Sequence, residues 1–318
     1  MGIKTPKKAI ITAAGLSSSF LPISKIYPRE MLAIGCKPVI HYVVEEAIDA
    51  GLEEIYIICD DNRSLCVDKE SQCSDRNSIV ESYFRDEYRD SERLDERTQF
   101  KQIKRLRQLS KIDKSFIKSV FKEDDSFSGY VQVINDHKEI FEKNPFVLMF
   151  GDVLTKKEDK CTRNLIDAYH YYETQMIAVK NISPFEVNQF GVINASKIGN
   201  NIYNVRKIVE KPKKEYASSS LAVMGRYVCD GDFFNYSGGK KYISPILNNM
   251  MKGINGGFSK SHPKKIHAQR FFGKSFKIFD EIEFLKAQIE FLVNDKEVYD
   301  ELIQCLNEKK IKFKEGVI

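Results

Sequence analysis

The sequence lacks the cysteine and histidine patterns that mark a metal-binding or disulfide-exchange domain. Its seven cysteines form no C-x-x-C pair, and its five histidines form no cluster at ligand spacing. A zinc ribbon and a thioredoxin-type motif are therefore absent. Cys66 and Cys73 lie in a polar segment without a nearby histidine, which disfavours metal binding there. Cys59 and Cys229 end β-like runs, and we expect both to be small buried hydrophobic residues.

Long hydrophobic runs and an excess of one charge are also missing. No stretch of about 18 apolar residues occurs, and the residues before the first strand contain no apolar core of a secretory signal. The 50 basic and 45 acidic side chains are interspersed, so the net charge of +5 gives no support for nucleic-acid binding. We therefore expect a cytoplasmic protein with neither a membrane nor a nucleic-acid partner. A length of 318 residues fits one large α/β domain or a domain with appendages.

The chain is organised around residues 9–32, where a short apolar run meets a loop of small residues. The run AIITAA is β-branched or small throughout and predicts a strand buried on both faces. A glycine and three serines follow, and the backbone N–H groups of such a loop can approach an anion. Pro22 and Pro28 disfavour helix at the residues before them, so the next segment is expected to be extended. This basic arm carries Lys25 and Arg29, but the pattern alone is only a weak indication of phosphate binding.

Hydrophobic periodicity predicts an alternation of helices and strands along most of the chain. A helix over 41–50 and a strand over 54–59 follow the first strand, which makes a right-handed βαβ start to a parallel sheet. Further strands are predicted at 116–121, 145–150, 176–180 and 190–193. Helices are predicted at 161–173 and, as a pair, over 281–313. Asp152 follows the strand that ends at 150, and ligands of open α/β sheets bind at such strand ends.

Residues 60–120 differ from the rest because charged side chains are dense and apolar anchors are sparse. This composition predicts long, largely solvent-facing helices. We treat 1–295 as one domain that includes this helical excursion, and 296–318 as a C-terminal helical tail.

The segment AAGLSSSFLPISKIYPREML (13–32) resembles the signature loop of the bacterial UTP–glucose-1-phosphate uridylyltransferases. That family's pattern is A-A-G-x-G-T-R-x-x-P-x-T-K-x-x-P-K-E-M-L-P. VRKIVEKPKKE (205–215) and SSLAVMGRYVCDGDFF (219–234) are similar to the family's V-E-K-P and S-N-L-A-x-x-G-R-Y-V segments. The resemblance covers residues 7–295, although 60–120 matches loosely. It implies an α/β nucleotide-diphospho-sugar transferase fold, with a mixed, mostly parallel sheet and helices on both faces.

The resemblance also implies a reaction in which UTP and a hexose 1-phosphate give a UDP-hexose, such as UDP-glucose, and pyrophosphate, with Mg²⁺ as the cofactor. The catalytic contacts would fall on Lys25, Arg29 and Lys211. The nucleotide contacts would fall on Ala13, Ala14, Gly15, Glu30 and Gly129. The hexose contacts would fall on Gly191, Glu210 and Lys211. Asp152 matches the first Mg²⁺ ligand, and Asp280 would supply the second if the register slips by one residue.

Several positions depart from the family's pattern on the nucleotide side. Ser19 replaces the arginine of G-T-R, which removes a fixed charge, and Arg29 replaces the lysine of P-K-E. Two positions near the base also change, Lys122 for a glutamine and Phe127 for a glycine. Lys277 falls on the second metal-binding aspartate, so we expect it to form an ion pair with Asp152 and to weaken Mg²⁺ binding.

Two functions are consistent with this pattern. The first is an active uridylyltransferase, and the second is a non-catalytic paralogue that binds a sugar phosphate or an active family subunit as a regulator. Because the hexose-contacting positions are better retained, hexose phosphate should bind better than UTP. Apolar stripes within 80–110 and 281–313 favour a homo-oligomer or a mixed oligomer with an active relative, and a solvated helical face is the alternative. The first stripe consists of Leu94, Phe100, Ile103 and Leu106.

Overall fold

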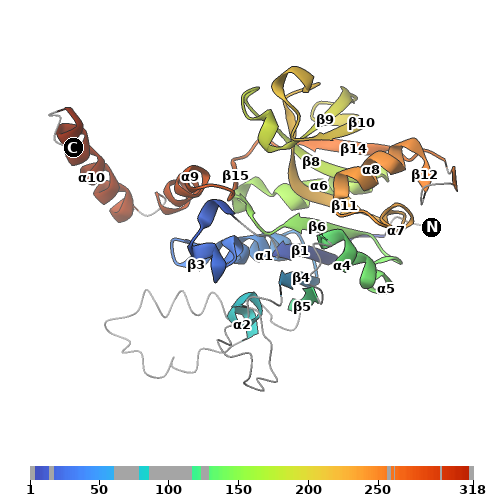
Figure 1. Ribbon diagram of the computed structural model, residues 1–318, viewed down its shortest axis with the longest axis horizontal. Coiled ribbons are helices and arrows are strands. Elements are labelled where there is room, and N and C mark those ends of the chain that lie inside the picture. Colours follow the sequence, from blue (N-terminus) through green and yellow to red (C-terminus); the bar gives the residue numbers. More distant parts are fainter. Residues whose placement is uncertain are drawn as a thin grey trace.

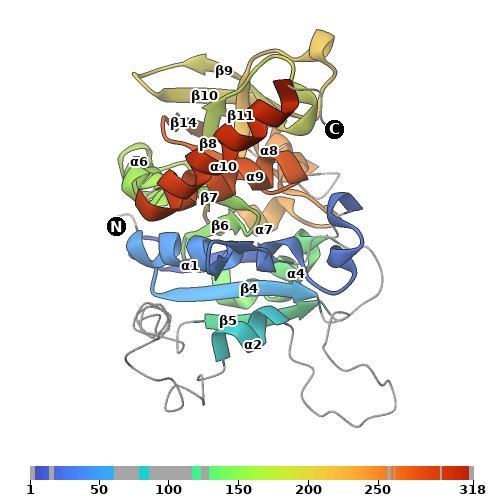
Figure 2. The ribbon, with the colours of Figure 1, turned by 90° about the vertical axis from the view of Figure 1, so that its left-hand side faces the viewer.

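A nine-stranded mixed sheet forms the centre of the molecule in the computed structural model (Figure 1). The structure describes residues 4–13, 18–60, 79–85, 117–122, 129–255, 259–260, 262–293 and 296–314. From one edge to the other the strands are β5 (Ile117–Lys122), β4 (Glu54–Asp60), β1 (Lys8–Ala13), β6 (Phe146–Phe150), β11 (Leu221–Cys229), β8 (Gln175–Asn181), β14 (Ile266–Arg270), β10 (Ile202–Glu210) and β9 (Gly191–Lys197). Figure 2 shows this series from β5 at the bottom to β9 at the top.

The strands of this sheet run in two directions. β5, β4, β1 and β6 pair in parallel, and β8 pairs in parallel with β14. β11 is antiparallel to β6 and to β8, and β10 is antiparallel to β14 and to β9. β10 and β11 therefore run against the other strands. The expected mixed sheet is confirmed, but antiparallel neighbours are as frequent as parallel ones, so the expectation of a mostly parallel sheet is not. The carboxyl ends of β1, β6 and β8 meet at one edge, where open α/β sheets bind their ligands.

Helices cover both faces of the sheet, as expected. One face carries α1 (Val39–Asp49), α2 (Ile79–Arg85), α6 (Cys161–Tyr172) and α9 (Glu281–Leu292). The other carries α4 (Tyr130–Asp136), α5 (Lys138–Phe141), α7 (Phe233–Tyr236) and α8 (Ile243–Lys252). Successive side chains of a strand point to opposite faces of the sheet, and in β1 Ile10 lies in one hydrophobic core while Ala9 and Ile11 lie in the other. Its prediction as a strand buried on both faces is confirmed.

Shorter elements complete the fold. Three antiparallel pairs join β2 (Ala33–Ile34) to β3 (Lys37–Pro38), β7 (Val153–Thr155) to β15 (Ser275–Lys277), and β12 (Ile254–Asn255) to β13 (Ser259–Lys260). α10 (Lys296–Lys314) extends away from the sheet in Figure 1. It starts at the first residue of the expected tail, and the division into domain and tail stays a prediction. Within the described ranges, no helix has the length and apolar character needed to span a bilayer.

The predicted elements are present, each beginning within two residues of its expected start. Cys59 and Cys229 are buried, as expected of small hydrophobic residues in strands. Within residues 60–120 the structure describes α2 and the start of β5. The long helices expected there, with Cys66, Cys73 and the stripe from Leu94 to Leu106, lie outside the described residues.

The expectation of an extended arm after the first loop is wrong. The segment is folded into three 3₁₀ turns, η1 (Ser18–Phe20), η2 (Ile23–Lys25) and η3 (Arg29–Met31). The amide of Lys25 donates to the carbonyl of Pro22 at 3.1 Å, and that of Met31 donates to Pro28 at 2.8 Å. Proline restricts the residue before it, but its own fixed φ suits the start of a helical turn. Both prolines therefore begin turns instead of extending the chain.

The fully buried side chain of Arg226 connects β11 to helix α1 and to the turn between β6 and β7. The side chain of Arg226 on β11 is 0% exposed, and its Nη2 lies 2.7 Å from Oε2 of Glu46 on α1. Arg226 also donates to the carbonyl oxygens of Phe150 at 3.1 Å and Val153 at 2.7 Å. Glu46 accepts further hydrogen bonds from Thr155 and Thr162, at 2.9 and 2.5 Å.

These contacts satisfy most polar atoms of a buried ion pair, which is the condition for such a pair to be tolerated. The carbonyl oxygens of Phe150 and Val153 flank the turn that carries Gly151 and Asp152. The hydrogen bonds of Arg226 therefore hold that turn from both sides. Burial alone would raise the pKa of Glu46, but the charge of Arg226 outweighs burial and lowers it.

The buried pair leads to a first prediction. Arg226→Met should lower the free energy of unfolding by about 3–5 kcal/mol, because Glu46 would remain as an uncompensated buried charge. Arg163→Met is the matched control: Arg163 forms an exposed pair with Asp167 on α6, so its loss should cost less than about 1 kcal/mol. Urea unfolding followed by circular dichroism measures both, and equal losses would contradict the assignment.

Candidate functional site

Asp152 lies at the carboxyl end of β6, two residues beyond the last residue of the strand. Its side chain is 4% exposed. The preceding Gly151 donates its amide to the carbonyl of Thr12 on β1 at 3.0 Å. A Cβ at position 151 would lie 2.5 Å from that same oxygen and 3.3 Å from Cγ of Glu30. Only glycine allows this close approach, which brings Asp152 next to the η3 turn.

Arg29 and Glu30, both on η3, form a compact charged group with Asp152. Arg29 Nη2 lies 2.8 Å from Asp152 Oδ2, and its Nε lies 3.4 Å from Glu30 Oε1. Glu30 is 2% exposed, and its Oε2 has no hydrogen-bond partner among the described residues. Burial raises the pKa of Glu30 to about 7, although the neighbouring charge of Arg29 opposes the shift. Glu30 is therefore only partly ionised near neutral pH.

Lys277 reaches the same group from β15. It stands opposite Val153 in the β15–β7 pair, and the amide of Ile278 donates to the carbonyl of Asp152 at 2.8 Å. Burial lowers the pKa of the Lys277 ammonium, while the charge of Asp152 opposes this and that of Arg29 adds to it. The expected ion pair between Lys277 and Asp152 is wrong. The carboxylate pairs with Arg29 instead, because η3 turns that guanidinium back toward β6.

The second half of the site lies at the base of the β9–β10 hairpin. Ser244 on α8 donates to Oε1 of Glu210, the last residue of β10. The amide of Lys211 donates to the carbonyl of Phe190 at 3.0 Å, with Lys211 in the left-handed region at φ 43°. A Cβ on Gly191 would lie 3.1 Å from Glu210 Oε1. The structure thus brings together the three residues that the sequence assigned to the hexose.

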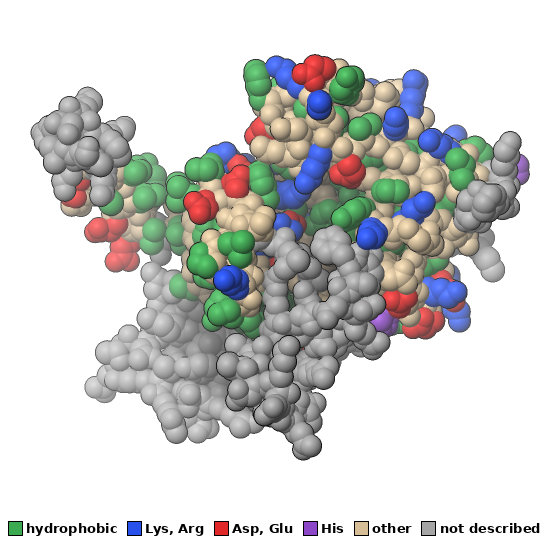
Figure 3. Space-filling model, viewed as in Figure 1, with side chains coloured by type: hydrophobic (Ala, Val, Ile, Leu, Met, Phe, Trp, Pro, Cys, Tyr) green, Lys and Arg blue, Asp and Glu red, His purple; other side chains and the backbone are tan. Residues whose placement is uncertain are grey.

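Lys277 links the two halves. Its Nζ lies 5.5 Å from the ring centroid of Phe190, the neighbour of Gly191. The charges of Asp152, Arg29, Lys211 and Glu210 all act on the pKa of this ammonium. Figure 3 shows a hollow near the centre of this face of the molecule, with Lys and Arg side chains gathered around it.

Lys180 is a site residue that the sequence analysis missed. Its Nζ lies 5.2 Å from the Phe190 ring centroid and 3.3 Å from the carbonyl oxygen of Ser275, to which it donates. β11 pairs with both β8 and β9, and Ala222 stands opposite Lys180 on one side and Val192 on the other. The sequence feature that could have identified Lys180 is its position at the end of the predicted strand 176–180.

The remaining predicted residues are placed less closely. Gly129 precedes α4 at φ 76°, and a Cβ there would lie 2.6 Å from the carbonyl oxygen of Lys241. The side chain of Lys25 is exposed on η2, and no hydrogen bond or ion pair joins its ammonium to another described residue. Ala13 is buried at the end of β1. Ala14, Gly15, Phe127 and the side chain of Lys122 lie outside the described residues.

The described residues do not fit a magnesium ion held by two protein carboxylates. Asp152 is already paired with Arg29, and the position on β15 opposite the next residue, Val153, is a lysine. Asp280 caps α9 instead, since its Oδ1 accepts from the amide of Glu283 at 2.8 Å. In the described part of the chain, no three His, Cys, Asp or Glu side chains gather in a group that could hold a metal.

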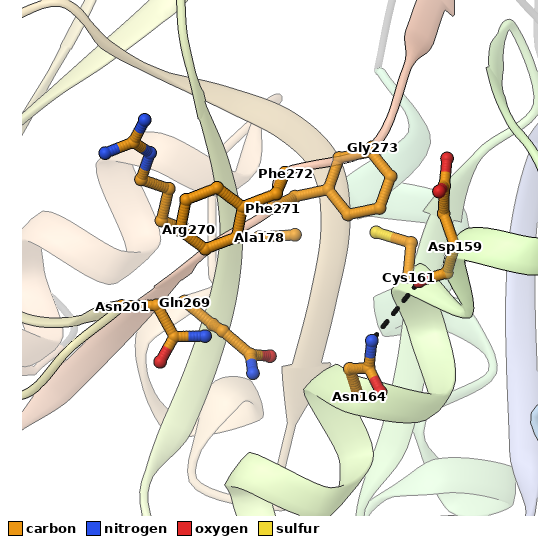
Figure 4. A pocket seen from close by; sticks show the side chains of 10 residues that line it. All are labelled: Asp159, Cys161, Asn164, Ala178, Asn201, Gln269, Arg270, Phe271, Phe272 and Gly273. Carbon is orange, nitrogen blue, oxygen red and sulfur yellow. Dashed lines mark hydrogen bonds between the residues drawn. The ribbon is translucent and has the colours of Figure 1, made fainter.

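A separate cavity of about 260 Å³ lies beside the start of α6 (Figure 4). Asn164 donates to the carbonyl oxygen of Asp159 at 3.2 Å on one side of it, and Arg270 stacks at 4.7 Å on the ring of Phe272 on the other. None of the residues around Asp152 or Glu210 lines this cavity. It is therefore not part of the candidate site.

Comparison with known proteins gives a consistent result. The model of the family described as Nucleotidyl transferase matches residues 8–254. The UTP–glucose-1-phosphate uridylyltransferase YngB of Bacillus subtilis (strain 168) is 30% identical over 305 residues, which are 96% of each chain. A crystal structure of an apo UDP-glucose pyrophosphorylase has a TM-score of 0.73 at 25% identity, covering 90% of this chain and 98% of that one. A UDP-glucose pyrophosphorylase complexed with UDP-glucose has a TM-score of 0.70 at 26% identity, with the same coverage.

The burial of Glu30 leads to a second prediction, on stability and pH. In the folded state Glu30 keeps its proton up to about pH 7, whereas in the unfolded chain its pKa has the ordinary value of 4.5. The contribution of Glu30 to stability is therefore greatest at low pH and is lost as the pH rises through 7. Between pH 5 and 8, the wild type should lose about 2 kcal/mol relative to Glu30→Gln.

Urea unfolding of both proteins at several pH values measures this difference. Glu53→Gln is the matched control, because Glu53 forms an exposed pair with Lys7 and its loss should matter by less than about 1 kcal/mol at each pH. Parallel curves for wild type and Glu30→Gln would show that Glu30 is ionised throughout.

Proposed function

Because the chain belongs to the nucleotidyltransferase family, we propose that it is a UTP–glucose-1-phosphate uridylyltransferase that forms UDP-glucose and pyrophosphate. One observation carries the proposal: Lys277 lies between the Arg29–Asp152 group and the Glu210–Lys211 group, since the amide of the next residue, Ile278, donates to the carbonyl of Asp152 at 2.8 Å and Lys277 Nζ lies 5.5 Å from the ring centroid of Phe190, the neighbour of Gly191. Two phosphorylated substrates need such a site, with groups that bind each of them and cationic side chains where their phosphates meet. The named relative and the structure complexed with UDP-glucose support the substrate pair.

The reaction is a phosphoryl-type displacement. An oxygen of the glucose 1-phosphate attacks the α-phosphorus of UTP, a new P–O bond forms, and the bond to the leaving pyrophosphate breaks. The protein needs to supply little covalent chemistry, so positioning and charge stabilisation dominate.

The hexose half binds and orients glucose 1-phosphate in this proposal. The Glu210 carboxylate, fixed on one oxygen by Ser244, accepts hydrogen bonds from sugar hydroxyls with its other oxygen. Lys211 places its ammonium next to the sugar phosphate. On the other half, Arg29 presents a guanidinium fork to UTP oxygens. No step is assigned to a metal held by this chain, because the expected ligands Asp152 and Asp280 are engaged elsewhere. We also propose a cytoplasmic location, since UTP and hexose phosphates are made and consumed inside cells.

The third prediction tests this function. The purified protein, given UTP, glucose 1-phosphate and Mg²⁺, should release pyrophosphate and form UDP-glucose, measured by coupled pyrophosphate detection and chromatography. Gly191→Ala should raise the KM for glucose 1-phosphate roughly tenfold, because the new methyl group would displace the Glu210 carboxylate.

Gly199→Ala is the matched control on the same hairpin. A Cβ there would meet Tyr172 Oη at an ordinary 3.5 Å, so kinetics should not change. If glucose 1-phosphate binds but no UDP-glucose forms, the protein is instead the non-catalytic sugar-phosphate-binding relative.

We further propose that the C-terminal helices take part in a homo-oligomer or in a mixed oligomer with an active relative. They expose large apolar side chains at helical spacing, Ile282, Leu285 and Ile289 on α9 and Tyr299, Ile303 and Leu306 on α10. Contiguous exposed apolar surface of this kind is typical of protein–protein contacts.

The fourth prediction concerns this assembly. Light scattering at roughly tens of micromolar protein should give a mass above that of one chain, because an interface of the usual stable size holds subunits together at such concentrations. Leu285→Lys with Ile289→Lys should reduce the mass, whereas Tyr171→Lys, at an exposed site on α6, should not. A monomeric wild type would count against the homo-oligomer.

A further inference from the structure

The surroundings of Asp152 are cationic where a two-carboxylate metal site would need acidic side chains. Arg29 lies on one side of the carboxylate, at 2.8 Å. Backbone pairing also brings Lys277 to this site: it stands opposite Val153 in the β15–β7 pair, and the amide of the next residue, Ile278, donates to the carbonyl of Asp152 at 2.8 Å. The register of β15 on β7 therefore fixes the backbone of Lys277 beside Asp152.

Lys277 has no anionic partner of its own. Arg29 already neutralises Asp152, and the described residues offer Lys277 Nζ no hydrogen bond or ion pair. Its nearest defined contact is the face of the Phe190 ring, at 5.5 Å from the centroid. Burial lowers its pKa, so the folded protein holds this ammonium at a cost. A half-buried cation that has no hydrogen bond or ion pair with a described residue is expected where a bound anion completes the site.

The position of Lys277 indicates which anion. On the nucleotide side, the residue after it, Ile278, donates its amide to the carbonyl of Asp152 at 2.8 Å, and on the hexose side Lys277 Nζ lies 5.5 Å from the ring centroid of Phe190, whose carbonyl accepts from the amide of Lys211. It therefore stands where two phosphate groups would meet. An arginine fork and a lysine point charge are the two side chains that proteins use to bind phosphate oxygens directly.

We propose that Lys277 and Arg29 bind diphosphate oxygens directly and take the place of a protein-held metal ion, so that this chain binds a diphosphate without a divalent cation. The identification of that diphosphate as part of UTP or as the released pyrophosphate rests on the proposed function. The binding site itself rests on the geometry around Asp152.

The test is calorimetric titration of the intact protein with inorganic pyrophosphate, once in EDTA and once with Mg²⁺. The wild type should bind pyrophosphate in EDTA, and Mg²⁺ should improve the affinity by less than about threefold. Lys277→Gln should weaken binding in EDTA by about tenfold or more, because a charge-assisted hydrogen bond is lost. Lys277→Arg should keep most of the affinity. Lys277→Asp should create a carboxylate pair with Asp152 and make pyrophosphate binding depend on Mg²⁺.

Lys274→Gln is the matched control. Lys274 lies three residues away on the same connection, is exposed, and pairs with Glu290, so its loss should leave pyrophosphate binding unchanged. A wild type that binds pyrophosphate only with Mg²⁺ would overturn the proposal, and so would a Lys277→Gln variant with unchanged affinity.

Failure of this proposal and failure of the proposed function give different results. Pyrophosphate binding in EDTA without UDP-glucose formation keeps the cationic site and rejects the enzyme. UDP-glucose formation by a protein that binds pyrophosphate only with Mg²⁺ keeps the enzyme and rejects the cationic site.

Discussion

The buried ion pair of Arg226 and Glu46 is the interaction on which the rest of the structure depends. A guanidinium that is 0% exposed must have its donors satisfied, and here they bind a carboxylate from α1 and carbonyl oxygens on both sides of Asp152. The β6–β7 turn, α1 and β11 are thereby fixed relative to one another. The candidate site is built on this turn, so its geometry depends on the Arg226–Glu46 ion pair, to which we assign no contact with a substrate.

The charge distribution of the site follows from which elements converge on that turn. η3 supplies Arg29 and Glu30, and β15 supplies Lys277. Beside Asp152, burial raises the pKa of the Glu30 carboxyl to about 7, so the acidic character of the group is weak near neutral pH. The site is thus better suited to phosphate oxygens than to a metal cation. The hexose half is different, because Glu210 is held by Ser244 and left facing Gly191.

Sequence reasoning predicted the fold because the relevant signals are local. The AIITAA run and the apolar strand ending before Asp152 each record a burial pattern within a few residues. Gly191, Glu210 and Lys211, which the resemblance assigns to the hexose, lie together in the structure, and their contact with a hexose stays a prediction. The arm after the first loop was predicted wrongly. Proline disfavours helical geometry at the residue before it, but its own φ suits the start of a helical turn. Here the carbonyls of Pro22 and Pro28 accept i→i+3 hydrogen bonds, so the segment forms turns.

The sequence by itself determined the family, the alternation of strands and helices, and the residue types at most site positions. Only the tertiary structure decided which charges meet. Arg29 and Asp152 are more than a hundred residues apart, and nothing in the local pattern says that they become neighbours. The pairing of Asp152 with Arg29 instead of Lys277 was settled by the 3₁₀ turn at 29–31 and by the register of β15 on β7. Local sequence sets backbone preference over a few residues, whereas an ion pair depends on distances between side chains that only the packed chain defines.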